Sequence, residues 1–165
     1  MSVQVVYKNK VKSSISATVV VFVDDKYNIN SSNILLNKNE VLFINKILKT
    51  KKSNKNKLFT ININEKKSVL IVFYGKNISI NDFEKLGASC FEFLEKNSLN
   101  SVIINSASIS VKNSNQLLDH FIHGLNLKSY KFQSYKSKKN KKLIRITVLG
   151  KQNIKITKNL RALQQ

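Results

Sequence analysis

The chain has 165 residues, of which 42% are hydrophobic and 8% aromatic, so its length and composition predict one folded domain, 1–165, rather than a disordered chain. A single cysteine excludes an internal disulfide, and no apolar run approaches the ~20 residues that a membrane-spanning helix needs. The N-terminus lacks the regions of a secretory signal, so we expect a cytoplasmic protein with no membrane partner.

The net charge of +20 comes almost entirely from lysine, because only Arg145 and Arg161 among the 29 basic residues are arginines. A charge of this size suggests a partner such as nucleic acid or an anionic membrane. Arginine, whose planar fork suits bidentate recognition of phosphate and guanine, is nearly absent, however. A compositional drift toward Lys, Asn and Ile explains the same charge, and both explanations stay open.

The first part of the chain predicts two strands followed by a helix. The strands are Val3–Tyr7 and Ala17–Val23, and the second is almost continuously apolar, which is typical of an interior strand covered on both faces by helices. The helix is expected from about Glu40 to Lys49, with one apolar stripe and with Asn39 available as its N-cap.

Two more strands and a second helix follow. Leu58–Ile63 mixes polar and apolar positions, which predicts one wet face, whereas Ser68–Phe73 is again apolar throughout most of its length. The second helix begins after Ser79, where Ser79–Asp82 matches a capping box with Asp in place of the usual Glu. On this helix, Gly87-Ala88 allows a neighbour to approach closely, and Glu92 and Lys96 are expected to pair on the outer side.

The last part of the chain predicts a strand at Ser101–Ile104, a third helix and a strand at Leu143–Leu149. The third helix begins near Asn113 or Ser114 and is expected to reach about Lys128, because its apolar spacing continues past Gly124. A short final helix is expected after Thr157. Strands that alternate with helices predict an α/β fold with a mixed, largely parallel central sheet flanked by helices.

The residue types that carry catalysis are sparse. His120 and His123 are three residues apart on the third helix, but Asp119, the only adjacent carboxylate, points about 100° away from His120. We therefore interpret both as surface or boundary histidines near a helix end. Cys90 lies on the apolar face of the second helix and is interpreted as a small buried hydrophobe. No pair of carboxylates is placed for acid–base hydrolysis, so we predict no catalytic or metal-binding residue in this chain.

The remaining candidate site is a pair of segments, Lys49–Lys57 and Lys128–Lys142, that are rich in lysine and contain no acid. The second interleaves Tyr130, Phe132 and Tyr135 with lysines, an arrangement that can stack bases while the charges follow a phosphate backbone. Equally, Tyr130 and Phe132 could fold back on the sheet while the lysines solvate a loop before the strand at Leu143–Leu149. The candidate polyanion contacts are Lys128, Lys131, Lys136, Lys138, Lys139, Lys141 and Lys142.

Three blocks resemble the N-terminal domain of the leucine (cytosol) aminopeptidase family. Lys67–Lys76 is similar to a family strand that ends in a Gly-Lys turn, and Asp82–Leu94 is similar to the helix that follows. Gly124–Lys139 resembles the family pattern Gly-x-x-Leu-x-Ser-Tyr-x-Phe-x-x-Tyr-Lys, and Leu143–Gly150 resembles the next strand.

The resemblance implies a macro-domain-like α/β fold placed ahead of a two-metal peptidase domain that is absent from this chain. In the family, that second domain releases N-terminal amino acids from peptides with a pair of divalent cations, zinc or manganese. The N-terminal domain supports a hexamer and shapes access to the active sites. The partners implied are therefore the C-terminal peptidase domain of the same protein and, in the full-length parent, further copies in a hexamer. Some bacterial members bind DNA, which is the alternative partner, and no cofactor is implied for this chain itself.

Overall fold

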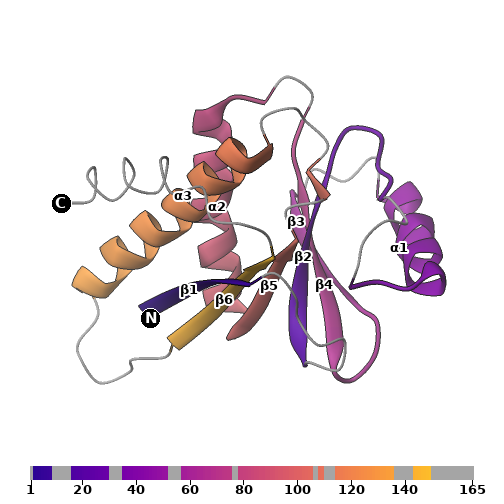
Figure 1. The fold of residues 1–165 in the computed structure, drawn as a ribbon, viewed down its shortest axis with the longest axis horizontal. Coiled ribbons are helices and arrows are strands. Elements are labelled where there is room, and N and C mark those ends of the chain that lie inside the picture. Colours follow the sequence, from indigo (N-terminus) through magenta and orange to yellow (C-terminus); the bar gives the residue numbers. More distant parts are fainter. Residues whose placement is uncertain are drawn as a thin grey trace.

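A computed structural model describes residues 2–8, 16–29, 35–51, 57–75, 78–105, 108–109, 114–135 and 143–149. In this part of the chain a twisted sheet lies between helices (Figure 1). The strands are β1 (Ser2–Lys8), β2 (Ala17–Val23), β3 (Leu58–Asn62), β4 (Lys67–Phe73), β5 (Ser101–Asn105) and β6 (Leu143–Leu149). The helices are α1 (Lys38–Thr50), α2 (Ile80–Lys96) and α3 (Ser114–Tyr135).

The sheet has the strand order β1-β6-β5-β2-β4-β3. Every neighbouring pair is parallel except β3 and β4, which are antiparallel and place β3 at one edge. The predicted mixed, largely parallel sheet is therefore confirmed. The predicted bounds of β2 and β6 match the structure, and those of the other strands agree within one residue at each end.

The two faces of the sheet form two separate cores. On one face α1 packs Val41, Ile44 and Leu48 against the half of the sheet made by β2, β4 and β3. On the other face α2 and α3 bury a cluster that includes Phe22 and Phe121. Successive residues of a strand point to opposite faces, so β2 must be apolar at every position that either core covers. All seven of its residues are buried, as its continuous pattern predicts.

The N-cap of α1 is Asn37, and the prediction of Asn39 is wrong. Asn37 Oδ1 accepts a hydrogen bond from the backbone N–H of Glu40 at 2.8 Å, and Glu40 Oε2 accepts one from the backbone N–H of Asn37 at 3.0 Å. This reciprocal capping box needs Glu or Gln three residues after the cap. Asn37 has Glu40 at that position, whereas Asn39 has Leu42 there.

The capping box predicted for α2 is confirmed. Ser79 Oγ accepts a hydrogen bond from the backbone N–H of Asp82 at 3.1 Å, and Asp82 Oδ2 accepts one from the backbone N–H of Ser79 at 3.3 Å. Hydrogen bonding of the Asp82 carboxylate to Ser79, first to the hydroxyl and then to the backbone N–H, holds the pKa of Asp82 below its usual value.

Helix α3 continues to Tyr135, seven residues past the predicted end at Lys128. Gly124 does not end the helix but lies inside it, where α2 passes directly over it. Only glycine fits there, because a Cβ atom would be 1.9 Å from the carbonyl oxygen of Glu84. Beyond the crossing, Lys128 Nζ lies 2.7 Å from Glu92 Oε1, so Glu92 pairs with α3 rather than, as predicted, with Lys96. Contacts with α2 thus reach the predicted end at Lys128, and the helix continues beyond it to Tyr135.

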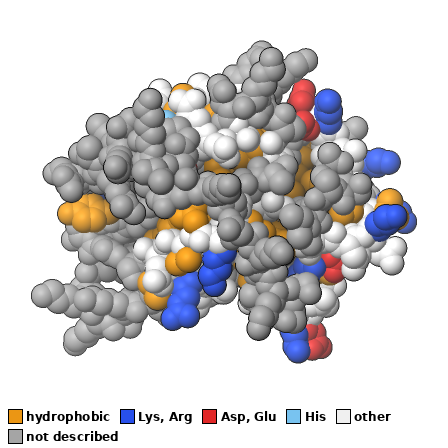
Figure 2. All heavy atoms as spheres, in the orientation of Figure 1, with side chains coloured by type: hydrophobic (Ala, Val, Ile, Leu, Met, Phe, Trp, Pro, Cys, Tyr) orange, Lys and Arg blue, Asp and Glu red, His pale blue; other side chains and the backbone are white. Residues whose placement is uncertain are grey.

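Basic side chains are spread over the molecule. On the face shown in Figure 2, the described lysine and arginine side chains lie over several elements instead of forming one continuous patch. None of the described helices is long and apolar enough to cross a membrane. The final helix expected after Thr157 falls outside the described residues.

Candidate functional site

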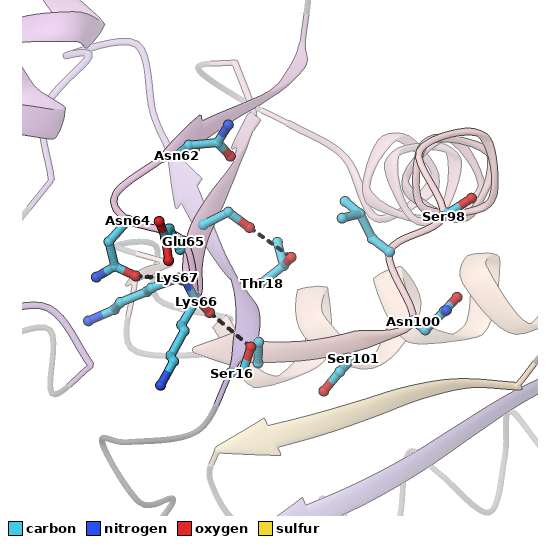
Figure 3. Close-up of a pocket in the computed structure, with 13 residues that line it drawn as sticks. Ser16, Thr18, Asn62, Asn64, Glu65, Lys66, Lys67, Ser98, Asn100 and Ser101 are labelled. Atoms are coloured by element: carbon cyan, nitrogen blue, oxygen red, sulfur yellow. Dashed lines mark hydrogen bonds between the residues drawn. The ribbon is translucent and has the colours of Figure 1, made fainter.

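A polar pocket of about 580 Å³ opens at the edge of the sheet where β2, β4 and β5 begin (Figure 3). The amino ends of these three parallel strands meet there, and the turn between β3 and β4 and the turn between α2 and β5 form the walls. The lining consists of Ser16–Thr18, Asn62, Asn64–Ser68 and Ser98–Ser101.

Local hydrogen bonds fix both walls. In the first wall, Asn64 Oδ1 accepts hydrogen bonds from the backbone N–H groups of Lys66 and Lys67, each at 2.9 Å. In the second wall, Ser98 has a left-handed backbone with φ of 54°, and its N–H donates to the carbonyl of Glu95 at 3.2 Å. Side chains that short polar turns hold in this way are preorganised for hydrogen bonding.

The pocket offers hydrogen bonds but little net charge. Thr18 Oγ1 and Ser68 Oγ share a hydrogen bond of 2.9 Å at its base, and Ser16 Oγ donates to the carbonyl of Lys66 at 3.2 Å (Figure 3). The ammonium of Lys67 is engaged elsewhere, at 2.9 Å from Glu40 Oε2 and 2.6 Å from the carbonyl oxygen of Leu35. The only carboxylate in the lining is that of Glu65, so the pocket contains no acid–base pair.

Its position also argues against a catalytic role. Ligands of open α/β sheets bind outside the carboxyl ends of the strands, and this pocket lies at the amino ends. Sequence reasoning missed the pocket because its three strands begin at positions 17, 67 and 101, and only the sheet brings those ends together.

The two histidines of α3 face one carboxylate of α2. Nδ1 of His123 lies 3.2 Å and Nδ1 of His120 lies 3.6 Å from Glu84 Oε2. The interpretation of both as surface or boundary histidines near a helix end is wrong for His123, which is buried in the middle of the longer helix. Within the described ranges no three His, Cys, Asp or Glu side chains are grouped so that they could hold a metal ion.

Two further titratable groups are buried in the cores. Burial raises the pKa of the Cys90 thiol to about 12, so this side chain is a protonated hydrophobe, as predicted, and not a nucleophile. Burial also raises the pKa of Asp119 to about 6, an effect that the neighbouring His120 partly offsets. In the described part of the molecule, Asp119 Oδ2 has no hydrogen-bond partner.

The lysine-rich segment begins as helix and not as a loop. Lys128 and Lys131 lie on α3, where Lys128 is paired with Glu92 and Lys131 is exposed. Tyr130 is 73% exposed, so it does not anchor this segment on the sheet. The other candidate polyanion contacts, Lys136, Lys138, Lys139, Lys141 and Lys142, lie outside the described residues.

The strand order and the helices on both faces define the class of fold, which solved structures share. A mutant of tomato leucine aminopeptidase matches 99% of this chain with a TM-score of 0.68 at 12% identity, and the match covers 35% of the tomato chain. The macrodomain of Thermus aquaticus DarG gives a TM-score of 0.62 at 6% identity, with 91% of this chain and 100% of that one covered. A mutant Oceanobacillus iheyensis macrodomain gives 0.52 at 13% identity, over 98% and 92% of the two chains. The predicted macro-domain-like fold is confirmed.

The family follows from the sequence. The model of the cytosol aminopeptidase family, N-terminal domain, matches residues 19–139, well over half of the chain. The chain therefore belongs to this family, as the three blocks indicate. The sequence matches none of the curated proteins with which it was compared.

Proposed function

We propose that this chain is the non-catalytic N-terminal domain of a leucyl aminopeptidase, which supports assembly of the oligomer and shapes access to the active sites. The parent would be a cytoplasmic two-metal hydrolase, with zinc or manganese, that releases N-terminal amino acids from peptides. The family membership supports this proposal, and so does the match to 35% of the tomato leucine aminopeptidase chain, which leaves room for a separate peptidase domain.

The observation that carries the non-catalytic role is how the acidic side chains of the described residues are used. Glu40 pairs with Lys67, Glu92 pairs with Lys128, and the carboxylate of Asp82 accepts a hydrogen bond from the backbone N–H of Ser79 at the start of α2. A two-metal hydrolase needs several carboxylates or imidazoles around each ion. Because the described ranges contain no such group, we assign the metals and the chemistry to the peptidase domain.

The assembly role is tested by removing residues 1–165 from the full-length parent and measuring its mass by sedimentation velocity. We expect the intact parent to sediment as a hexamer and the truncated protein to sediment as smaller species. A truncated protein that remains a hexamer with unchanged access of large peptide substrates would contradict the proposal.

A second candidate is a nucleic-acid-binding module. One observation favours it: Tyr130 and Lys131 are exposed side by side near the end of α3, just before the five lysines at 136–142. Aromatic and basic side chains in this arrangement fit a nucleic-acid strand. The charge of +20 would also attract phosphate over a wider area.

This candidate predicts that the chain retards duplex DNA in a gel. Its affinity for the DNA should fall at least about tenfold between about 50 and 200 mM salt. Changing Lys138, Lys139, Lys141 and Lys142 to glutamate should abolish the retardation. The matched control is Lys26→Glu with Lys66→Glu, which alters exposed lysines elsewhere. No retardation at low salt, or equal loss in the control, removes the candidate.

A further inference from the structure

The outer surface of α1 carries two large apolar side chains in solvent. Leu42 is 61% and Phe43 is 47% exposed, although three other apolar residues of the helix are buried against the sheet. The other exposed large hydrophobic residues of the described part, such as Ile80 and Leu143, are isolated from one another along the chain. Adjacent exposed apolar residues on a helix mark an interaction surface more often than scattered ones do.

Three lysines flank Leu42 along the helix. Lys38 and Lys46 lie four residues before and after Leu42, and Lys49 lies seven residues after it, so all three share its side of the helix. All three are exposed. The single acid of α1, Glu40, is turned to Lys67 and neutralised there. At the right-hand edge of Figure 2, where α1 lies, blue basic and orange hydrophobic side chains occur together.

We infer that this face, defined by Lys38, Leu42, Phe43, Lys46 and Lys49, docks an acidic surface with apolar side chains on the peptidase domain of the parent. The inference rests on the proposed function. An apolar centre ringed by charge is the usual anatomy of a protein interface, with Leu42 and Phe43 as the desolvated anchors. The surrounding lysines demand a partner with carboxylates.

Charge argues against a second copy of the chain as the occupant of this face. A second copy of the chain would bring another +20 and the same lysines to the contact. A nucleic-acid strand would satisfy the lysines but would leave Leu42 without an apolar partner. A protein surface that combines acidic and apolar groups satisfies both.

Lysine acetylation footprinting of the full-length parent and of the 165-residue chain tests this docking. Lys46 and Lys49 report on the face, whereas Lys26 and Lys66 are exposed lysines in turns outside α1 and serve as internal controls. We expect Lys46 and Lys49 to react about tenfold more slowly in the parent than in the chain, because a docked interface excludes water and reagent. Lys26 and Lys66 should react within about twofold of their rate in the chain.

A pair of variants of the parent separates docking from general shielding. Leu42→Ser with Phe43→Ser should return the labelling of Lys46 and Lys49 to the rate seen in the chain. Ile80→Ser with Tyr130→Ser, which removes exposed apolar side chains from α2 and α3, should leave the protection intact.

Several outcomes overturn the inference. Unprotected Lys46 and Lys49 in the parent remove it, as does protection of Lys26 or Lys66 in their place. Protection of the isolated chain by phosphatidylserine vesicles, with none in the parent, assigns the face to a membrane and also removes the inference.

If the hexamer depends on residues 1–165 while Lys46 and Lys49 stay reactive, the proposed function stands and the docking face fails. If the parent without residues 1–165 assembles normally while Lys46 and Lys49 are protected in the intact parent, the docking face stands and the proposed function fails.

Discussion

Gly87 and Gly124 set the distance between α2 and α3. A Cβ atom on Gly87 would be 1.9 Å from the carbonyl oxygen of Phe121, and one on Gly124 would be 1.9 Å from that of Glu84. Each glycine thus receives a backbone carbonyl of the opposite helix, and the carbonyl lies three residues before the other glycine. Backbone atoms, unlike the end of a flexible side chain, cannot move aside at little cost.

The two glycines lead to a prediction about stability. Gly87→Ala and Gly124→Ala should each lower the free energy of unfolding by about 1–3 kcal/mol, because the helices must separate and the core between them loosens. Gly75→Ala is the matched control, because a Cβ at Gly75 meets nothing within 4 Å. Urea unfolding measures all three. If Gly124→Ala were as stable as the control, the close crossing would be wrong.

Asp119 gives the fold a dependence on pH. Its pKa in the folded state is raised to about 6 from the ordinary value of 3.8, chiefly by burial. The folded protein therefore holds this proton more tightly than the unfolded chain does. The resulting stabilisation is fully present below about pH 4 and is lost as the pH rises through about 6.

Asp119→Asn should remove that dependence. Between pH 4 and 7 the wild-type protein is expected to lose about 1–3 kcal/mol relative to the variant, because the variant has no carboxylate to ionise in the core. Urea unfolding of both proteins at a series of pH values measures the difference between their free energies of unfolding. A constant difference across this range would show that Asp119 ionises freely in the folded state.

At the scale of elements, the start of α1 depends on one side chain. Asn37 Oδ1 accepts a hydrogen bond from the backbone N–H of Glu40. The carboxylate of Glu40 accepts one from the backbone N–H of Asn37 and also pairs with Lys67. Asn37→Ala should therefore destabilise the protein by about 1 kcal/mol. Asn39→Ala, two positions away on an exposed part of the helix, should stay within about 0.5 kcal/mol of wild type, as surface changes usually do. Thermal unfolding compares the two, and equal losses would contradict this cap assignment.

The elements also show how far the sequence could predict the structure. Strand β2 could be located to the residue, since both cores require apolar side chains and polar residues flank it. The N-cap of α1 was ambiguous, because Asn37 and Asn39 are both good caps and a reciprocal bond decides between them. The contacts of Gly124 and Lys128 with α2 could not be predicted, because they are tertiary.

The candidate site was less predictable than the fold. The local sequence identified Cys90 as a core residue, since a single periodic helix face determines its burial. The shared contact of His120 and His123 with Glu84 depends on the crossing of two helices that are distant in sequence. Leu42 and Phe43 did leave a signal: they fall outside the apolar stripe of α1, where exposed positions are expected to be polar.

At the scale of the whole molecule, the described part is a layered α/β body whose polar interactions serve its structure. Its ion pairs join α1 to β4 and α2 to α3, and its polar pocket lies at the amino ends of the strands. The chain covers 35% of the related tomato enzyme. These features fit a domain that supports chemistry carried out elsewhere in the parent.

Hydrolysis of leucine amide by the purified 165-residue chain, with and without added manganese or zinc, tests this account most directly. The full-length parent, assayed in parallel, shows that the substrate and the metals are competent. We predict metal-dependent turnover by the parent and none by the chain above the rate in buffer. Metal-dependent release of leucine by the pure chain would mean that it contains a reactive centre, and the account of a supporting domain would then be wrong.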